Sequence, residues 1–160
     1  MPNRHLSRTI AMQSLYEWDF HKKKDVGEII ARNFEVFEKE DVDKPYIKAL
    51  CQGVIKNYQD IDQKIQRAAT QWPLDQIPIL DKTLLRLSTY ELIYQDDIPP
   101  KVAINEAVEI GKTFGSENTS KFINGVLGTL YKNEEELIKQ KTKNRWKTFQ
   151  EKIKKSQKSK

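Results

Sequence analysis

Apolar residues recur every three or four positions along most of the chain, which is the spacing of one face of an α-helix. Residues 4–20 and 101–114 each have one such stripe. Another runs through Val26, Ile29, Ile30, Phe34 and Phe37. No segment alternates apolar and polar residues for long, as a half-buried strand would. The pattern therefore predicts an all-α fold.

Proline and capping residues divide this pattern into six or seven helices. Asp43 and Pro45 predict the start of a long helix over residues 44–69, which ends before Trp72-Pro73. At 1.5 Å per residue this helix would span roughly 40 Å, enough to act as a spine for the others.

The second half of the chain has similar boundaries. Two prolines before Lys101 force an extended connection, and a helix begins near that lysine. Gly115 is well placed to end it, and Thr119 or Ser120 can cap the next helix. We expect six or seven helices.

Charge is unevenly distributed along the chain. Residues 139–160 contain ten Lys or Arg and one acid, whereas residues 1–138 contain 18 Lys or Arg and 22 acids. The isoelectric point of about 9.1 therefore reflects the C-terminal end. We divide the chain into a helical body, residues 1–138, and a basic C-terminal extension, residues 139–160.

The extension is expected to be helical at first and disordered from residue 154. Trp146, Phe149 and Ile153 lie at i, i+3 and i+7, so one side of this basic helix is apolar. Such a helix can dock on the body, on RNA or on a membrane surface, and a solubilising appendage is equally compatible with it.

Several classes of function lack the residues they need. The single cysteine, Cys51, lies far from His5 and His21 and has no ligand-like spacing to them, so no metal site is expected. No glycine-rich phosphate loop or catalytic constellation is evident, so neither a cofactor nor an enzymatic activity is predicted. No apolar run is long enough for a membrane span or a signal peptide, and we expect a cytoplasmic protein.

Three segments resemble the NusB family in order and spacing. The segments are AMQSLYEW at 11–18, ILDKTLLRLSTYEL at 79–92, and IPPKVAINEAVE at 98–109 followed by FGSE at 114–117 and KFINGVL at 121–127. The resemblance covers about residues 4–131, and the basic extension lies beyond it.

This resemblance implies a function as well as a fold. It implies an all-α protein of two three-helix halves that pairs with NusE, a small-subunit ribosomal protein. The pair would bind single-stranded boxA RNA and join the RNA polymerase antitermination complex, promoting read-through, notably of ribosomal RNA operons. Monomers and homodimers are both compatible with it.

The resemblance also suggests RNA-binding residues at the amino terminus. Arg4 and Arg8 are one helical turn apart, so both guanidiniums can point the same way and contact successive phosphates, with His5 beside them. We expect Lys101 to be a peripheral phosphate contact.

A second RNA-binding candidate is the loop between Phe114 and Phe122. Single-stranded RNA is held by aromatic stacking next to cations, and Lys121 and Asn118 lie in this segment. The alternative is that both phenylalanines end apolar stripes and lie in the core.

Tyr16, Asp75 and Asp81 match positions through which the family contacts its basic ribosomal partner. Carboxylates there would steer and orient that partner. Asp81 has an alternative explanation, because an acid in the first turn of a helix is favourable for dipole reasons alone.

Two other functions stay open. A NusB-like domain also precedes the catalytic region of ribosomal RNA cytosine methyltransferases, but the 160 residues contain no glycine-rich cofactor loop of that kind. A protein-interaction module without an RNA role is the third possibility.

Overall fold

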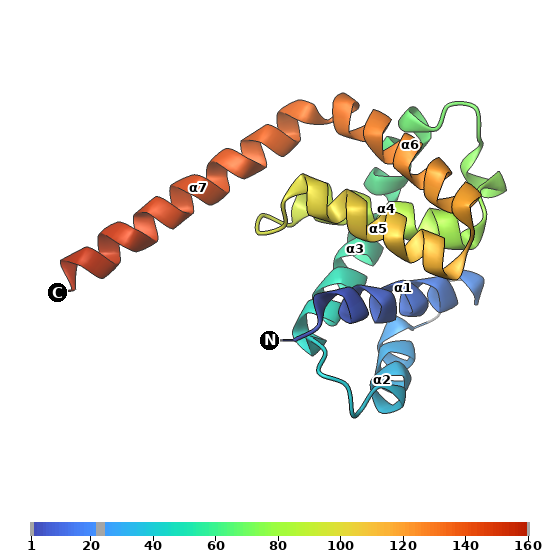
Figure 1. Ribbon diagram of the computed structural model, residues 1–160, viewed down its shortest axis with the longest axis horizontal. Coiled ribbons are helices and arrows are strands. Elements are labelled where there is room, and N and C mark those ends of the chain that lie inside the picture. The colour runs from blue at the N-terminus through green and yellow to red at the C-terminus, as the bar shows by residue number, and fades with distance from the viewer. Residues whose placement is uncertain (1, 22–24, 160) are drawn as a thin grey trace.

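The fold is built of helices alone throughout the described part of the chain. A computed structural model describes residues 2–21 and 25–159, and residues 1, 22–24 and 160 lie outside the described residues. The elements are α1 (Arg4–Phe20), α2 (Val26–Val36), α3 (Lys44–Ala68), the short 3₁₀ helix η1 (Leu74–Gln76), α4 (Ile79–Tyr94), α5 (Pro100–Phe114), α6 (Glu117–Asn133) and α7 (Glu135–Lys158). No strand occurs within these two ranges, so the predicted fold class is confirmed (Figure 1).

Helix α3 is the spine of the body, as its length predicted. Asp43 caps it by accepting a hydrogen bond from the amide of Tyr46, and the helix packs against α1, α2, α4 and α6. It runs unbroken through Gly53, where an added Cβ would lie 2.1 Å from Cζ of Tyr90. The glycine therefore allows α4 to approach the spine closely.

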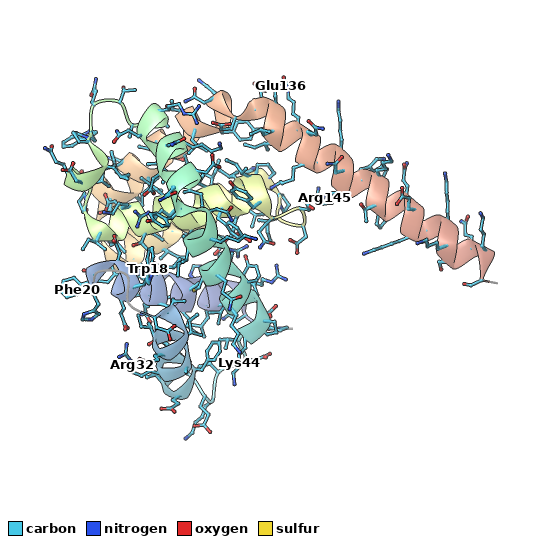
Figure 2. All side chains as sticks on the ribbon, turned by 180° about the vertical axis from the view of Figure 1, so that it is seen from behind. Trp18, Phe20, Arg32, Lys44, Glu136 and Arg145 are labelled. Carbon is cyan, nitrogen blue, oxygen red and sulfur yellow. The ribbon has the colours of Figure 1, made fainter. Side chains whose placement is uncertain are left out.

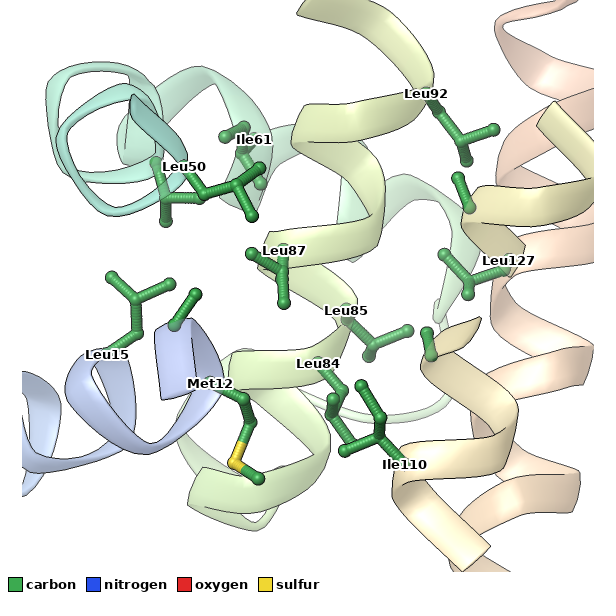
Figure 3. Close-up of a cluster of buried hydrophobic side chains, with 14 of the residues drawn as sticks. Met12, Leu15, Leu50, Ile61, Leu84, Leu85, Leu87, Leu92, Ile110 and Leu127 are labelled. Atoms are coloured by element: carbon green, nitrogen blue, oxygen red, sulfur yellow. The ribbon is translucent and has the colours of Figure 1, made fainter. Parts of the chain in front are cut away.

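A single apolar core joins the two halves, α1–α3 and α4–α6. Leu15 and Leu50 enter it from the first half, and Ile110 and Leu127 enter it from the second (Figure 3). Helix α4 contacts α1 and α3 of the first half as well as α5 and α6 of its own half, and it is buried on most of its circumference. The body is therefore one packed unit in which α4 fixes α1 against α5 and α6.

Helix α7 leaves the body and projects away from it (Figures 1 and 2). Only Ile138 and Lys141 are buried on it, so the expected boundary at residue 138 falls inside the helix, not between two elements. The helix continues to Lys158, beyond residue 154, where we expected disorder to begin. Its straight-chain Lys and Gln residues favour helix, and Lys155 and Lys158 lie at the favourable C-terminal end of its dipole.

Within the described ranges, no helix combines the length and the apolar character that crossing a membrane requires.

Candidate nucleic-acid and partner interface

The first turn of α1 presents Arg4 at the surface. Asn3 caps the helix by accepting a hydrogen bond from the amide of Leu6, which fixes where the turn begins. The Arg4 guanidinium lies 4.1 Å from the centroid of the Tyr46 ring and 3.7–3.8 Å from the carboxylates of Asp43 and Asp97. The side chain is half exposed, so the guanidinium keeps solvent-facing donors for a phosphate.

His5 and Lys101 extend this corner onto α5. Nδ1 of His5 lies 2.6 Å from Oε2 of Glu106, and this contact joins α1 to α5. Lys101 is exposed in the first turn of α5 and lines a groove of about 300 Å³ with Ile104 and Tyr131. Three predicted RNA contacts, Arg4, His5 and Lys101, are thus distributed around one end of the body.

Arg8 does not share this surface, and the expectation that it points outward with Arg4 is wrong. It is only 4% exposed, and its Nε and Nη2 donate hydrogen bonds of 2.9–3.0 Å to the carboxylate of Glu91 on α4. Burial alone would lower the pKa of Arg8, but the hydrogen bonds and charge of Glu91 raise it overall. The turn that carries Arg8 faces α4, so the positive charge of Arg8 is paired with Glu91 inside the body.

A second buried arginine mirrors Arg8. Arg86 on α4 donates two 2.8 Å hydrogen bonds to Asp62 on α3 and lies 3.3 Å from Asp19 on α1. Arg8 and Arg86 therefore fasten α1 and α4 at opposite ends of their contact. Arg86 and Glu91 are therefore structural side chains that tie helices together.

Phe114 and Tyr16 line one groove at the opposite end of α1 and α5. Phe114 is 48% exposed, so it is not a core residue. Both rings line a groove of about 330 Å³ together with Met12, Gln13, Glu17 and Leu80. A residue predicted for RNA and one predicted for the partner thus share one groove.

The connection after Phe114 turns tightly at Gly115. An added Cβ would lie 2.6 Å from Oγ1 of Thr119 and 2.9 Å from the carbonyl oxygen of Gly111, so only glycine fits. Ser116 caps α6 in a reciprocal capping box with Thr119, one turn earlier than predicted. Asn118 is exposed in the first turn of α6.

Phe122 and Lys121 lie on a different groove from Phe114. Phe122 is half-buried against the core and meets the ring of Trp72 edge to face, with centroids 6.3 Å apart. These two rings, Lys121 and Gly125 line a groove of about 280 Å³ between α6 and the end of α3. Lys121 is exposed at its rim. The two phenylalanines therefore do not bracket a single stacking site.

The three predicted partner residues differ in exposure. Tyr16 is partly exposed and stacks on the exposed ring of Phe20, at 6.3 Å and 7°. Asp75 is exposed in η1. Asp81 is only 8% exposed, and burial raises its pKa. It lies in the first turn of α4, where the helix dipole favours an acid, but burial outweighs that effect on its pKa.

Sequence reasoning missed three residues at these surfaces. Phe20 lies one turn after Tyr16 on the exposed side of α1, and that spacing was the available signal. Trp72 was interpreted only as the end of a helix. Lys141 is buried, and its Nζ donates a 3.0 Å hydrogen bond to the carbonyl oxygen of Glu91, which no pattern in the sequence indicated.

Acids and histidines do not gather into a metal-binding cluster anywhere in residues 2–21 and 25–159. The surfaces described above contain cations, amides and aromatic rings, which suit binding through phosphates and bases.

Comparisons with known proteins agree with this geometry. Residues 5–132 match the family model described as the NusB family. The transcription antitermination protein NusB of Clostridium novyi is 41% identical over 133 residues, covering 81% of this chain and 98% of that protein. NusB of Acetivibrio thermocellus is 40% identical over 129 residues, covering 81% and 88%.

Solved structures show the same fold. T. maritima NusB has a TM-score of 0.74 and 32% identity over 82% of this chain and 93% of that chain. A chain in the crystal structure of antitermination factors NusB and NusE in complex with double-stranded RNA has a TM-score of 0.74 and 27% identity, covering 81% and 96%. With α1–α6 matched in both sequence and fold, and only the α7 region left over, the chain belongs to the NusB family.

Proposed function

We propose that this chain is a transcription antitermination factor that binds single-stranded boxA-type RNA together with a NusE ribosomal protein. The complex would join RNA polymerase and promote read-through, notably of ribosomal RNA operons. The observation that carries the proposal is family membership over residues 5–132, which include nearly all of the body.

The RNA surface that we propose follows the line where α1 and α5 approach each other. At one end are Arg4, His5 and Lys101, and at the other end is the exposed ring of Phe114. Cations at one end suit phosphates, and an exposed ring at the other suits a base. Asn118 and Lys121 are exposed in the first two turns of α6 and are further RNA contacts in this proposal, with Lys121 on the separate groove that contains Phe122.

The partner surface that we propose adjoins it. Tyr16 and Phe20 form an exposed stacked pair beside the groove that contains Phe114. Exposed aromatic residues are typical anchors of protein interfaces, and the exposed Asp75 of η1 would complement a basic partner. Because one groove borders both surfaces, RNA and partner can each increase the effective concentration of the other.

The test is binding of a labelled boxA-like RNA to the full chain, with and without a NusE ribosomal protein, against a scrambled RNA. We expect the ternary complex to prefer the boxA-like sequence. Phe114→Ala should weaken RNA binding about tenfold, and Lys121→Gln should weaken it less and reduce its salt dependence.

Lys48→Gln is the matched control, because Lys48 is an exposed lysine of α3 that lies outside both proposed surfaces. Equal, wholly salt-sensitive binding of boxA-like and scrambled RNA would refute the proposal. If the Tyr16→Ala variant binds the ribosomal protein as tightly as the native chain does, the aromatic pair is not part of the partner surface.

A further inference from the structure

The distal part of α7 is a charged surface that the family match leaves unexplained. It begins after Lys141 and lies outside residues 5–132, and every described residue from 142 to 159 is exposed. We call residues 142–158 the arm. Residues 139–160, which contain it, have a net charge of +9. A partner that fits this arm must be strongly anionic.

The arm also presents a flat aromatic pair to solvent. Trp146 and Phe149 are 60% and 51% exposed, and their rings stack at 5.6 Å with an interplanar angle of 28°. At 100° per residue, cations border this pair on both sides, with Arg145 and Lys152 on one side and Lys143 on the other. Aromatic rings between cations are the usual means of holding unpaired bases and their phosphates.

Other anionic or apolar occupants fit less well. A second copy of the arm, whose residues 142–158 contain seven Lys or Arg and one acid, would bring two segments of net charge +6 together, and like charges oppose such pairing. A membrane-surface helix needs a substantial apolar face. Here the face is limited to Trp146, Phe149 and Ile153, and Thr142 and Ser156 continue the same stripe with hydroxyls.

The base of the arm lies next to the RNA surface proposed above. Lys141 donates to the carbonyl oxygen of Glu91, whose carboxylate is held by Arg8 of α1. The loop after α4 reaches the same corner, where Asp97 lies 3.8 Å from Arg4. The amino terminus of α1 and the arm lie on the same side of the molecule in both views (Figures 1 and 2).

We infer that the arm is a second binding site for single-stranded RNA. It takes up the strand that continues past the body, with bases against Trp146 and Phe149 and phosphates against the flanking cations. The inference rests on the proposed function for the identity of the RNA. Because the arm binds by stacking bases on its rings and pairing phosphates with its cations, it accepts the continuing strand without a sequence requirement.

The test compares three labelled RNAs, one short and two long, on the full chain with its ribosomal partner. The short RNA is a boxA-like strand of about ten nucleotides, and the long RNAs add about ten unrelated nucleotides at either end. We expect one long RNA to bind more tightly than the short one. The double variant Trp146→Ala/Phe149→Ala should lower this gain in affinity about tenfold and leave the affinity for the short RNA unchanged.

Leu137→Ala is the matched control, because this exposed apolar side chain lies on α7 but on the side opposite the aromatic pair. Arg145→Gln/Lys152→Gln should reduce the salt dependence of long-RNA binding by a slope of about 1.4, since each cation contributes about 0.7 on a single strand. Circular dichroism should show unchanged helix content in each variant, since the substituted side chains contact solvent.

Three outcomes would overturn the inference. One is no gain from the added nucleotides, and another is an equal gain in the native chain and the aromatic variant. The third is tight binding of the arm to phosphatidylserine vesicles that the long RNA fails to displace. Loss of preference for the short boxA-like RNA instead contradicts the proposed function, and the contribution of the added nucleotides would still be measurable.

Discussion

The body and the arm use positive charge in opposite ways. In the body, Arg8 and Arg86 are buried and each is held by carboxylates of other helices. In the arm, every cation is exposed, and residues 139–160 contain only one acid. A cation beside a buried carboxylate fixes helices together, whereas a cation in water is available to a ligand. The position of the charge, not its amount, determines its role.

The same difference separates the two regions energetically. Removing one partner of a buried ion pair leaves an uncompensated charge in a medium of low dielectric constant, which is strongly destabilising. Removing an exposed charge changes stability little, because water and salt already screen it. The comparison therefore predicts large stability effects in the body and small ones in the arm.

The largest effect is expected for Arg8→Ala. The substitution leaves the Glu91 carboxylate buried without its bidentate partner, and we expect the free energy of unfolding to fall by about 3–5 kcal/mol. Urea denaturation followed by circular dichroism measures this change. A fall in the free energy of unfolding of less than about 1 kcal/mol would contradict the comparison, because Arg8 would then behave like an exposed arginine of the arm.

Arg145→Ala is the control for this prediction, since Arg145 is an exposed arginine of the arm. We expect it to change the free energy of unfolding by no more than about 0.5 kcal/mol.

An intermediate effect is expected at the joint between the two regions. Lys141→Ala leaves the buried carbonyl oxygen of Glu91 without its side-chain donor, at a cost of about 1–3 kcal/mol. Hydrogen exchange should show faster opening of the first turns of α7 before the body is affected. Lys143→Ala, an exposed neighbour, should leave both quantities unchanged. If Lys143→Ala has the larger effect, α7 is not anchored through Lys141.

The smallest effect is expected for Asp81→Asn. Burial raises the pKa of Asp81, so the folded state holds its proton more tightly than the unfolded chain does. The native chain therefore loses stability as the pH rises above about 3.9, through the folded-state pKa. The Asp81→Asn variant has no carboxyl group at this position and should avoid this loss. Relative to the native chain, its free energy of unfolding should rise by less than about 1 kcal/mol between pH 3 and pH 7. A relative loss over that range would contradict the direction of the shift.

The helices could be predicted from sequence because their signals are local. Asp43 and Pro45 marked the start of α3, and Gly115 marked the end of α5, since capping and chain reversal depend on a few adjacent residues. The cap of α6 was misplaced because Ser116, Thr119 and Ser120 are all competent caps. In the structure Ser116 is the cap, because its side chain and backbone amide exchange hydrogen bonds with Thr119.

The binding surface was harder to predict because it depends on contacts between distant segments. The spacing of Arg4 and Arg8 placed them one turn apart but did not reveal that Glu91, 83 residues away, would bury the second. For the same reason the sequence could not show that Phe114 shares a groove with Tyr16, or that Phe122 meets Trp72. Periodicity identifies one face of a helix, and only tertiary packing determines what covers it.

The anchoring of α7 at Lys141 sets a length scale for the molecule. Beyond this residue the helix continues to Lys158, and at 1.5 Å per residue its free end lies about 25 Å from the anchor. A helix that is anchored at one end holds its other end at a set distance from the anchor. It fixes how far from the body an attached strand can be guided, so inserting or deleting a helical turn would change that span in steps of about 5 Å.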